Sequence, residues 1–203
     1  YEPLGHIPLM MAWPGVAART NSALTTTVDI FATLCDIFGV SVDHRTHGHS
    51  LVPLVSGDSS AVRNYVLTGV WGRAVQIVHD QFKYVRAPHN DNRPLSMWSN
   101  RWSTMPIHAL PNVRLPKPDH RATLDYMPGS SVPVIRQPFE PGDAVPFWAM
   151  TNTGQARDLL FDVVGDPLED RDLSSTDLTE QMEGVLRSVL HDIEAPVDQF
   201  QRL

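Results

Sequence analysis

The first hydrophobic segment of the chain is a continuous run at residues 7–13, Ile-Pro-Leu-Met-Met-Ala-Trp, which is closed by Pro14 and Gly15. A short apolar run that ends in turn residues predicts a strand buried on both faces of a sheet. Such a strand needs neighbouring strands, and one strand with a following helix cannot cover two sheet faces. The pattern therefore predicts that the partner strands lie elsewhere, upstream or in another chain.

Helical periodicity follows this run. Thr26 and Asp29 resemble a capping box in which Asp takes the place of Glu, and Gly39 stands where a glycine ends a helix. Between them, apolar residues recur at helical spacing: Val28, Phe31, Leu34, Cys35 and Phe38. The sequence predicts a helix at about residues 27–38 whose apolar stripe, Cys35 included, packs in a core.

Extended patterns dominate the next part of the chain. Residues 65–70, 74–78 and 82–87 have the composition of strands, and residues 79–81 are typical of a turn between the last two. They predict an antiparallel hairpin. Residues 88–146 carry most of the 17 prolines and have little periodicity, so we expect an irregular excursion there.

Regular structure is predicted to resume towards the C-terminus. Residues 159–164 have a strand pattern that breaks at Gly165. A helix is predicted at 177–195, ending before Pro196, because apolar residues recur along one face. These residues are Leu178, Met182, Val185, Val189 and Ile193.

Composition narrows the classes of function. The 203 residues are 42% hydrophobic, which suffices for a sizeable core. Acidic residues exceed basic ones, 23 to 16, and no basic cluster stands out, which argues against nucleic-acid binding. No apolar stretch approaches the roughly 20 residues that span a bilayer, so we expect no membrane anchor. The single cysteine, Cys35, rules out an intrachain disulfide framework and favours a reducing, cytoplasmic location without fixing it. Because the chain starts at Tyr1 and has no signal-peptide pattern, we expect a fragment or a processed chain.

Four groups of residues are informative as an ordered set. They are Tyr1-Glu2 with 6–9 and 13–15, then 27–34 with 38–40, then 47–57, and last 82–85 with 160–163 and 166–170. Together they resemble the C-terminal half of sulfatases of the alkaline phosphatase superfamily. The third group, His-Gly-His-Ser-Leu-Val-Pro-Leu-Val-Ser-Gly, is similar to that family's loop Asp-Gly-x-Ser-Leu-x-Pro-Leu-Leu-x-Gly. The chain departs from the family at His6, where arginine is usual, and at His47, where aspartate is usual.

The resemblance implies an α/β fold with two parts. Residues 1–60 correspond to the last strand, helix and loop of a large sulfatase-type α/β/α domain with a mixed sheet. Residues 61–203 correspond to a small C-terminal antiparallel sheet packed on a helix, with the proline-rich excursion at 88–146 inserted in it. That excursion matches no general pattern of the family.

The resemblance also implies that the reactive groups lie before Tyr1. Sulfatases use a formylglycine, made from Cys or Ser in a Cys/Ser-x-Pro-x-Arg motif, and a Ca²⁺ or Mg²⁺ ion. Cys35 is not followed by that motif, and after Ser131 the next arginine, Arg136, comes one place too late. His47 and His49 offer two zinc ligands without a third. We therefore expect no catalytic residue and no metal site in this chain, which should be inactive alone and need the missing N-terminal part of its own protein as partner.

Two regions are candidates for the wall of a pocket for a small sulfated substrate. Glu2 and His6 stand where the family's chain passes from the active-site rim into the sheet, although the pattern favours His6 as a strand-edge histidine bonded to backbone. The second region, residues 89–93 with two tryptophans, combines amide and guanidinium donors with two indoles, which suits stacking on an aryl or sugar ring. Its candidate residues are His89, Asn90, Asn92, Trp98 and Trp102. Its alternative role is a proline-rich cover packed over hydrophobic surface.

Two other functions stay open. A phosphoester or phosphonate hydrolase of the same superfamily shares the architecture, and fold analogy does not separate these reactions. A free-standing carbohydrate-binding or interaction module would use Trp98 and Trp102. The organic group of the substrate and the oligomeric state, a homo-oligomer included, also stay open.

Overall fold

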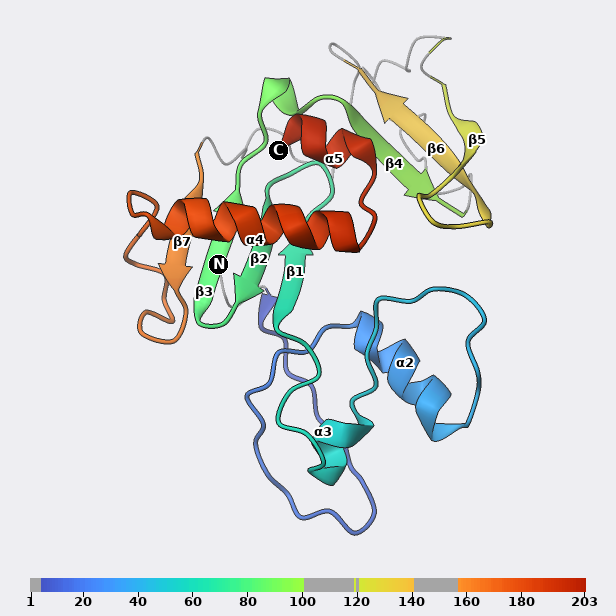
Figure 1. Ribbon diagram of the computed structural model, residues 1–203, viewed down its shortest axis with the longest axis vertical. Coiled ribbons are helices and arrows are strands. Elements are labelled where there is room, and N and C mark those ends of the chain that lie inside the picture. The colour runs from blue at the N-terminus through green and yellow to red at the C-terminus, as the bar shows by residue number, and fades with distance from the viewer. Residues whose placement is uncertain (1–4, 101–118, 120, 141–156) are drawn as a thin grey trace, which may run out of the picture. The chain divides into compact units, whose positions relative to one another are not determined.

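The computed structural model describes residues 5–100, 119, 121–140 and 157–203 (Figure 1). The strands form two antiparallel sheets, one in the order β1-β2-β3-β7 and one in the order β4-β6-β5. The α/β class predicted from the sequence is confirmed. No helix in the described ranges is long and apolar enough to cross a membrane. In chain order the elements are α2 (Val28–Ile37), α3 (Val52–Ser56), β1 (Tyr65–Gly69), β2 (Val75–His79), β3 (Phe82–Arg86), the 3₁₀ helix η1 (Asn90–Asn92), β4 (Leu95–Ser99), β5 (Thr123–Tyr126), β6 (Pro133–Phe139), β7 (Leu159–Asp162), α4 (Leu178–Asp192) and α5 (Val197–Arg202).

The chain divides into two compact units. The first comprises Tyr1–Thr68, Ile77–Lys83 and Asp162–Arg171, and it contains α2 and α3. The second comprises Gly69–Gln76, Tyr84–Phe161 and Asp172–Leu203, and it contains η1, the three-stranded sheet, α4 and α5. The boundary predicted at residue 60 was drawn from sequence resemblance, and it stays a prediction.

The predicted strand at residues 7–13 was wrong. This segment has no strand structure, and its apolar side chains other than the half-buried Trp13 are exposed, Met10 by 90%. A strand is held by hydrogen bonds to its neighbours, and among the described residues none pairs with this segment. The apolar pattern is present, but the described chain does not supply the sheet that the pattern calls for.

The helix predicted at 27–38 is confirmed as α2. The Asp29 carboxylate accepts a hydrogen bond from the Thr26 backbone N–H at 2.9 Å, which is one half of a capping box. At the other end Gly39 has φ 62°, and Val40 N donates to Cys35 O at 2.8 Å. This is the Schellman ending that the glycine predicted.

The hairpin predicted before residue 88 is confirmed as β2 and β3, and its turn places Asp80 at φ 52°. The later strand and helix are confirmed as β7 and α4. In the second unit α4 packs against the end of β3, where Arg86 lies 3.5 Å from Glu183. The buried face of α4 consists of Met182, Leu186, Val189 and Leu190.

The expectation of an irregular excursion at 88–146 was wrong for its described parts. β4 and β6 pair antiparallel along Leu95–Ser99, and β5 pairs with β6 along Thr123–Tyr126. Phe139 and Leu95 are fully buried here, and Trp71 packs edge-on against Phe139 with ring centroids 5.5 Å apart. Pro138 lies beyond the part of β6 that pairs with β5. Because β6 has a described neighbouring strand on one side only at this position, the N–H that proline lacks is tolerated.

Candidate functional site

The predicted substrate-wall residues are only partly within the described chain. Glu2 and Trp102 lie outside the described residues. His6 is exposed and belongs to the non-strand segment that precedes α2. His89, Asn92 and Trp98 all belong to the second unit, together with the backbone of Asn90.

Asn92 is held from two directions at the end of η1. Its Nδ2 donates to Gly72 O at 2.6 Å, and its Oδ1 accepts from Arg202 Nη1 at 2.8 Å. Both ends of the amide are therefore engaged within the protein. Asp91 and Asn92 have φ of 55° and 57°, so two successive non-glycine residues adopt the left-handed region, which carries a cost that the surrounding contacts must offset.

His89 stands at the start of this loop with an exposed side chain. Its backbone N donates to Arg202 O at 2.6 Å, and its own carbonyl accepts from Asn92 N at 2.7 Å. The backbone of His89 is thus fixed while its imidazole faces outward. Of the predicted residues in this loop, His89 has an exposed side chain, and the Asn92 amide is engaged within the protein.

Trp98 lies on β4 directly opposite Arg136 of β6. The Arg136 guanidinium carbon is 5.4 Å from the centroid of the indole, a cation–π arrangement. Arg136 Nε donates to Ser96 Oγ at 3.0 Å, and its Nη2 donates to Asp198 Oδ2 at 3.2 Å. Trp98 therefore belongs to a fixed pair of indole and guanidinium.

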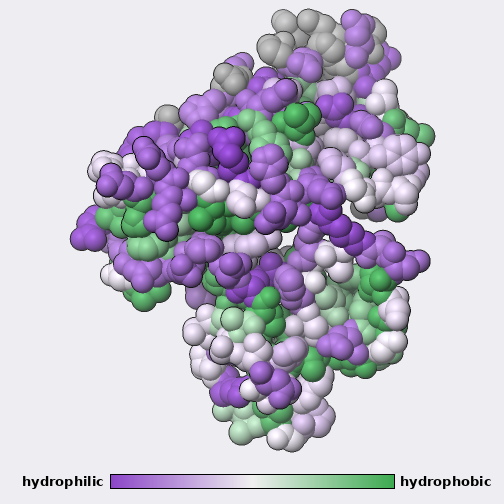
Figure 2. Space-filling view, in the orientation of Figure 1, coloured by the Kyte–Doolittle hydropathy of each residue, from purple (hydrophilic) through white to green (hydrophobic). Residues whose placement is uncertain are grey.

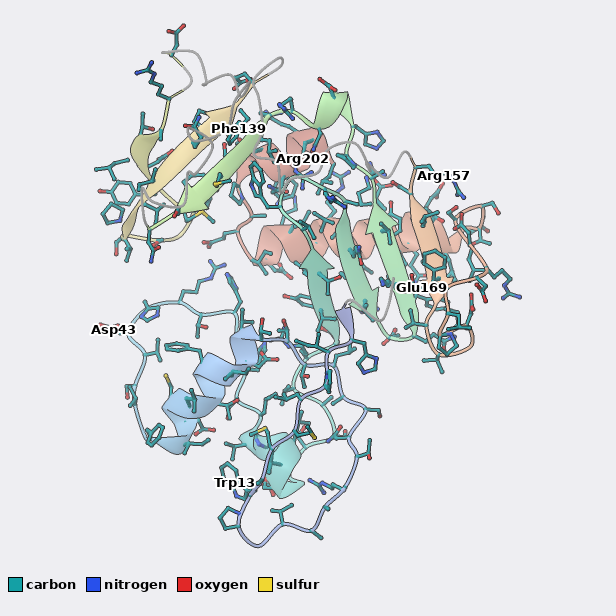
Figure 3. The ribbon with its side chains drawn as sticks, turned by 180° about the vertical axis from the view of Figure 1, so that it is seen from behind. Trp13, Asp43, Phe139, Arg157, Glu169 and Arg202 are labelled. Atoms are coloured by element: carbon teal, nitrogen blue, oxygen red, sulfur yellow. The ribbon has the colours of Figure 1, made fainter. Side chains whose placement is uncertain are left out.

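Helix α5 connects these two places. Asp198 and Arg202 are four residues apart, so they share one face of the helix, and both are buried. Asp198 reaches Arg136 and also accepts from Ser96 Oγ. Arg202, which is labelled in Figure 3, reaches Asn92 and donates to Arg73 O at 3.0 Å. Helix α5 was not predicted from the sequence. Its signal was the i, i+4 spacing of Asp198 and Arg202 after Pro196.

A titratable cluster ties β3 to the segment before β7. Tyr84 Oη donates to Asp158 Oδ2 at 2.5 Å, and Arg86 Nη1 donates to the same oxygen at 2.7 Å. Burial raises the pKa of Tyr84, and its hydrogen bond to Asp158 raises that pKa further. Burial acts to raise the pKa of Asp158 as well, but hydrogen bonds from Tyr84, Ala87 N and Arg86 outweigh it and lower that pKa. The phenol stays protonated and the carboxylate stays charged, so the cluster is a structural tie rather than an acid–base pair.

Helix α2 buries its polar face and exposes its apolar face, which is the reverse of the usual arrangement. Its buried residues are Asp29 and Thr33. Asp29 Oδ1 accepts from His49 N at 2.9 Å, Thr33 Oγ1 accepts from Leu51 N at 2.9 Å, and Arg63 Nε donates to Asp29 Oδ2 at 3.0 Å. The polar stripe of α2 is therefore the face that the first unit covers.

The first unit leaves most of the apolar stripe of α2 uncovered, although the Phe31 ring lies beside His44 with ring centroids 6.2 Å apart. The exposed members of the stripe are Val28, Phe31, Leu34, Ile37 and Phe38, the last by 74%. Figure 2 shows hydrophobic residues at the surface around this helix. The core packing predicted for this stripe does not occur within the described chain, because the segment at 47–51 occupies the opposite face. Cys35 is half-buried.

Metal-binding groups do not converge in the described ranges. No set of three or more His, Cys, Asp or Glu side chains there is placed to hold an ion. The residues described do not fit the divalent cation of a sulfatase, which needs several converging oxygen ligands.

Comparison with known proteins bears on the family. No protein-family model matches the chain. A choline-sulfatase from Rhizobium meliloti is 32% identical over 91 residues, which are 42% of this chain and 18% of that protein. Arylsulfatase K from Rattus norvegicus is 38% identical over 61 residues, 30% of this chain and 11% of that protein. The chain is related to sulfatases. The resemblance found in the sequence is thereby confirmed.

The matches cover only a small part of the length of these sulfatases. A delta 4,5-hexuronate-2-O-sulfatase from Bacteroides thetaiotaomicron is 27% identical over 92 residues, 43% of this chain and 18% of that protein. The matches thus span less than a fifth of the length of these three sulfatases. This chain was also aligned with a solved structure from work on glycosaminoglycan metabolism by Bacteroides thetaiotaomicron. The alignment includes 87% of this chain and 26% of the chain in that structure, with a TM-score of 0.46 and 15% sequence identity.

Proposed function

We propose that this chain is the C-terminal part of a sulfatase and that the longer protein hydrolyses a sulfate ester. The observation that carries the proposal is the match to several sulfatases, each over less than a fifth of its own length. The greater part of each relative lies outside the matched region. The activity is therefore assigned to the longer protein and not to these 203 residues.

The reactive groups are proposed to lie in the preceding part of the longer protein. Sulfate-ester hydrolysis needs a nucleophile, a cation that neutralises developing oxygen charge, and a general acid for the leaving oxygen. A formylglycine would supply the nucleophile, and Ca²⁺ or Mg²⁺ would supply the charge. Cys35 is followed by Asp36 inside α2 and has no Cys-x-Pro-x-Arg context, and the described residues offer no cation cluster. The chain alone is expected to be inactive.

The contribution of this chain is scaffold and part of the substrate wall. The apolar stripe of α2 and the apolar run at 7–13 are exposed together in the first unit. Covering such side chains stabilises by about 25 cal/mol per Å² of apolar surface removed from water. We infer that the preceding part of the same protein covers the α2 stripe and the exposed apolar side chains at 7–13.

The activity is tested by assaying the longer protein and this chain in parallel. Release of sulfate from p-nitrophenyl sulfate and from choline sulfate is measured, with p-nitrophenyl phosphate as the rival substrate. We expect the longer protein to release sulfate from at least one ester, to lose this activity when divalent cations are chelated, and the chain alone to release none. A longer protein that cleaves only the phosphate ester would assign it to phosphoester hydrolysis, and equal activity of the chain alone would contradict the proposal.

A further inference from the structure

The most deeply buried side chains of helix α5 are charged. Asp198 and Arg202 are 4% and 3% exposed, whereas Val197 at the start of the helix is 63% exposed. Phe200 adds a contact with His191 of α4, and the two rings are stacked with centroids 4.5 Å apart. Charged side chains are rarely buried unless they are paired or hydrogen-bonded. The position of α5 therefore depends on the partners of its two charges.

Asp198 anchors one end of α5 to the three-stranded sheet. Its carboxylate accepts from Ser96 Oγ of β4 and, at 3.2 Å, from Arg136 Nη2 of β6. In Figure 1 α5 lies beside β4, and both belong to the second unit. The side chain of Asp198 thus contacts two strands of this sheet.

Arg202 anchors the other end of α5 to the loop before β4. Its Nη1 donates to Asn92 Oδ1 at 2.8 Å and to Arg73 O at 3.0 Å, and its backbone carbonyl accepts from His89 N at 2.6 Å. Burial lowers the pKa of Arg202 to about 10, and the charge of Asp198 opposes this shift. The guanidinium is therefore charged at neutral pH, and its charge is easier to bury while Asp198 is in place.

A helix as short as α5 needs both anchors. Isolated helices shorter than about 12–15 residues are marginal in water, and α5 has six residues and no side-chain cap at Pro196. An undocked segment would lose its helical form and with it the spacing that places Asp198 and Arg202 on one face. Loss of either anchor is thus expected to weaken the other, although the two anchors bind different residues.

We propose that α5 is a clasp that docks and undocks as one unit, so that the loop at 89–92 and the Arg136 side chain are released together. The clasp is a conformational device of the second unit and is independent of the proposed sulfatase activity. The rival arrangement is two independent contacts, in which each anchor affects its own partners alone.

Hydrogen exchange in the full chain tests the clasp when each substitution is measured at the anchor that it does not touch. Asp198→Ala removes the anchor to the sheet. It should accelerate exchange of the His89 and Asn92 amides by about tenfold, because the docked helix loses hydrogen bonds to a charged group. Val197→Ala, at an exposed position of the same helix, is the matched control and should leave both amides unchanged.

The opposite anchor gives the complementary measurement. Arg202→Met should accelerate exchange of the Arg136 Nη2 protons, which Asp198 binds, by about tenfold. The Leu173 amide, which donates to Leu160 O at 2.7 Å, is the internal reference for the rest of the second unit. It should exchange as in the wild type in both variants.

Unchanged exchange of the amides at 89 and 92 in Asp198→Ala would show two independent contacts and overturn the clasp. Equal acceleration at Leu173 would mean that the whole second unit opens, which also overturns it. If Asp198→Ala does not fold, Asp198→Asn is measured in its place with the same two outcomes, because it keeps the shape of the side chain and removes its charge.

Discussion

Lys83 and Glu169 form a buried ion pair, with 2.7 Å between Lys83 Nζ and Glu169 Oε1 and both side chains 2% exposed. Lys83 comes from β3, and Glu169 comes from the turn after β7, where it adopts φ 56° (Figure 3). Both belong to segments that resemble the sulfatase pattern.

Removing one charge of this pair should destabilise the chain strongly. Glu169→Gln leaves the Lys83 ammonium buried without the carboxylate that it faces, which costs about 3–5 kcal/mol. Glu169→Leu combined with Lys83→Met removes both charges and should recover most of that loss. Urea unfolding of the chain measures both. Asp170→Asn, at the exposed neighbour, is the control and should change the free energy of unfolding by less than about 0.5 kcal/mol. A double variant as unstable as Glu169→Gln would contradict the assignment.

The same substitution should have opposite effects at two glycines. At Gly48 a Cβ would lie 2.3 Å from Val28 O and 3.3 Å from Ala32 Cβ, so Gly48→Ala must displace the loop from α2. We expect a loss of about 1–3 kcal/mol, in the range for overpacked sites. Gly184 lies inside α4 with nothing within 4 Å, and Gly184→Ala should gain about 0.5–1 kcal/mol from helix propensity. Thermal unfolding of the two variants decides this, and equal shifts in Tm would show that α2 does not approach the loop so closely.

Asp172 should make the chain sensitive to acid. Burial acts to raise the pKa of Asp172, but hydrogen bonds from Arg157, Ser174 and Leu160 N lower it to about 2. Because an unfolded aspartate has a pKa of about 3.9, the stabilisation is complete above about pH 4 and is lost as the pH falls towards 2. The difference in unfolding free energy between the wild type and Asp172→Asn should therefore shrink from pH 5 to pH 2. Arg157→Met should weaken this pH dependence of the unfolding free energy without abolishing it, because the backbone N–H donors to Asp172 remain. A difference that stays constant across this range would refute the role of Asp172.

The elements predicted from the sequence are those whose signals are local. The capping pair and Gly39 marked α2, the hairpin turn marked β2 and β3, and the apolar face of α4 marked the long helix. β6 was not predicted because Pro133 and Pro138 weaken its strand pattern. Proline is nevertheless tolerated at the first residue of a strand, where Pro133 stands, and where the strand has a described neighbour on one side only, as at Pro138. α5 has six residues, which is too short for periodicity to be recognised.

The candidate site was predicted less completely because its partners are distant in sequence. Asn92 is an amide in a polar loop, which suggested a ligand contact, but Arg202 lies 110 residues further on. The stripe of α2 was correctly predicted to be apolar, and its neighbours were expected upstream or in another chain. Periodicity identifies a face, but it does not identify what covers that face, and here Asp29 and Arg63 occupy the inner side.

We propose that the longer protein covers the apolar stripe of α2. Hydroxyl-radical footprinting of Phe31 and Phe38 in this chain and in the longer protein tests it most directly, with buried Tyr84 as the internal reference. We predict that both phenylalanines are oxidised in the chain alone and protected in the longer protein, while Tyr84 is unmodified in each. Equal oxidation of Phe31 and Phe38 in the two proteins would contradict the claim, and protection in the chain alone at concentrations where it forms dimers would assign the stripe to a second copy.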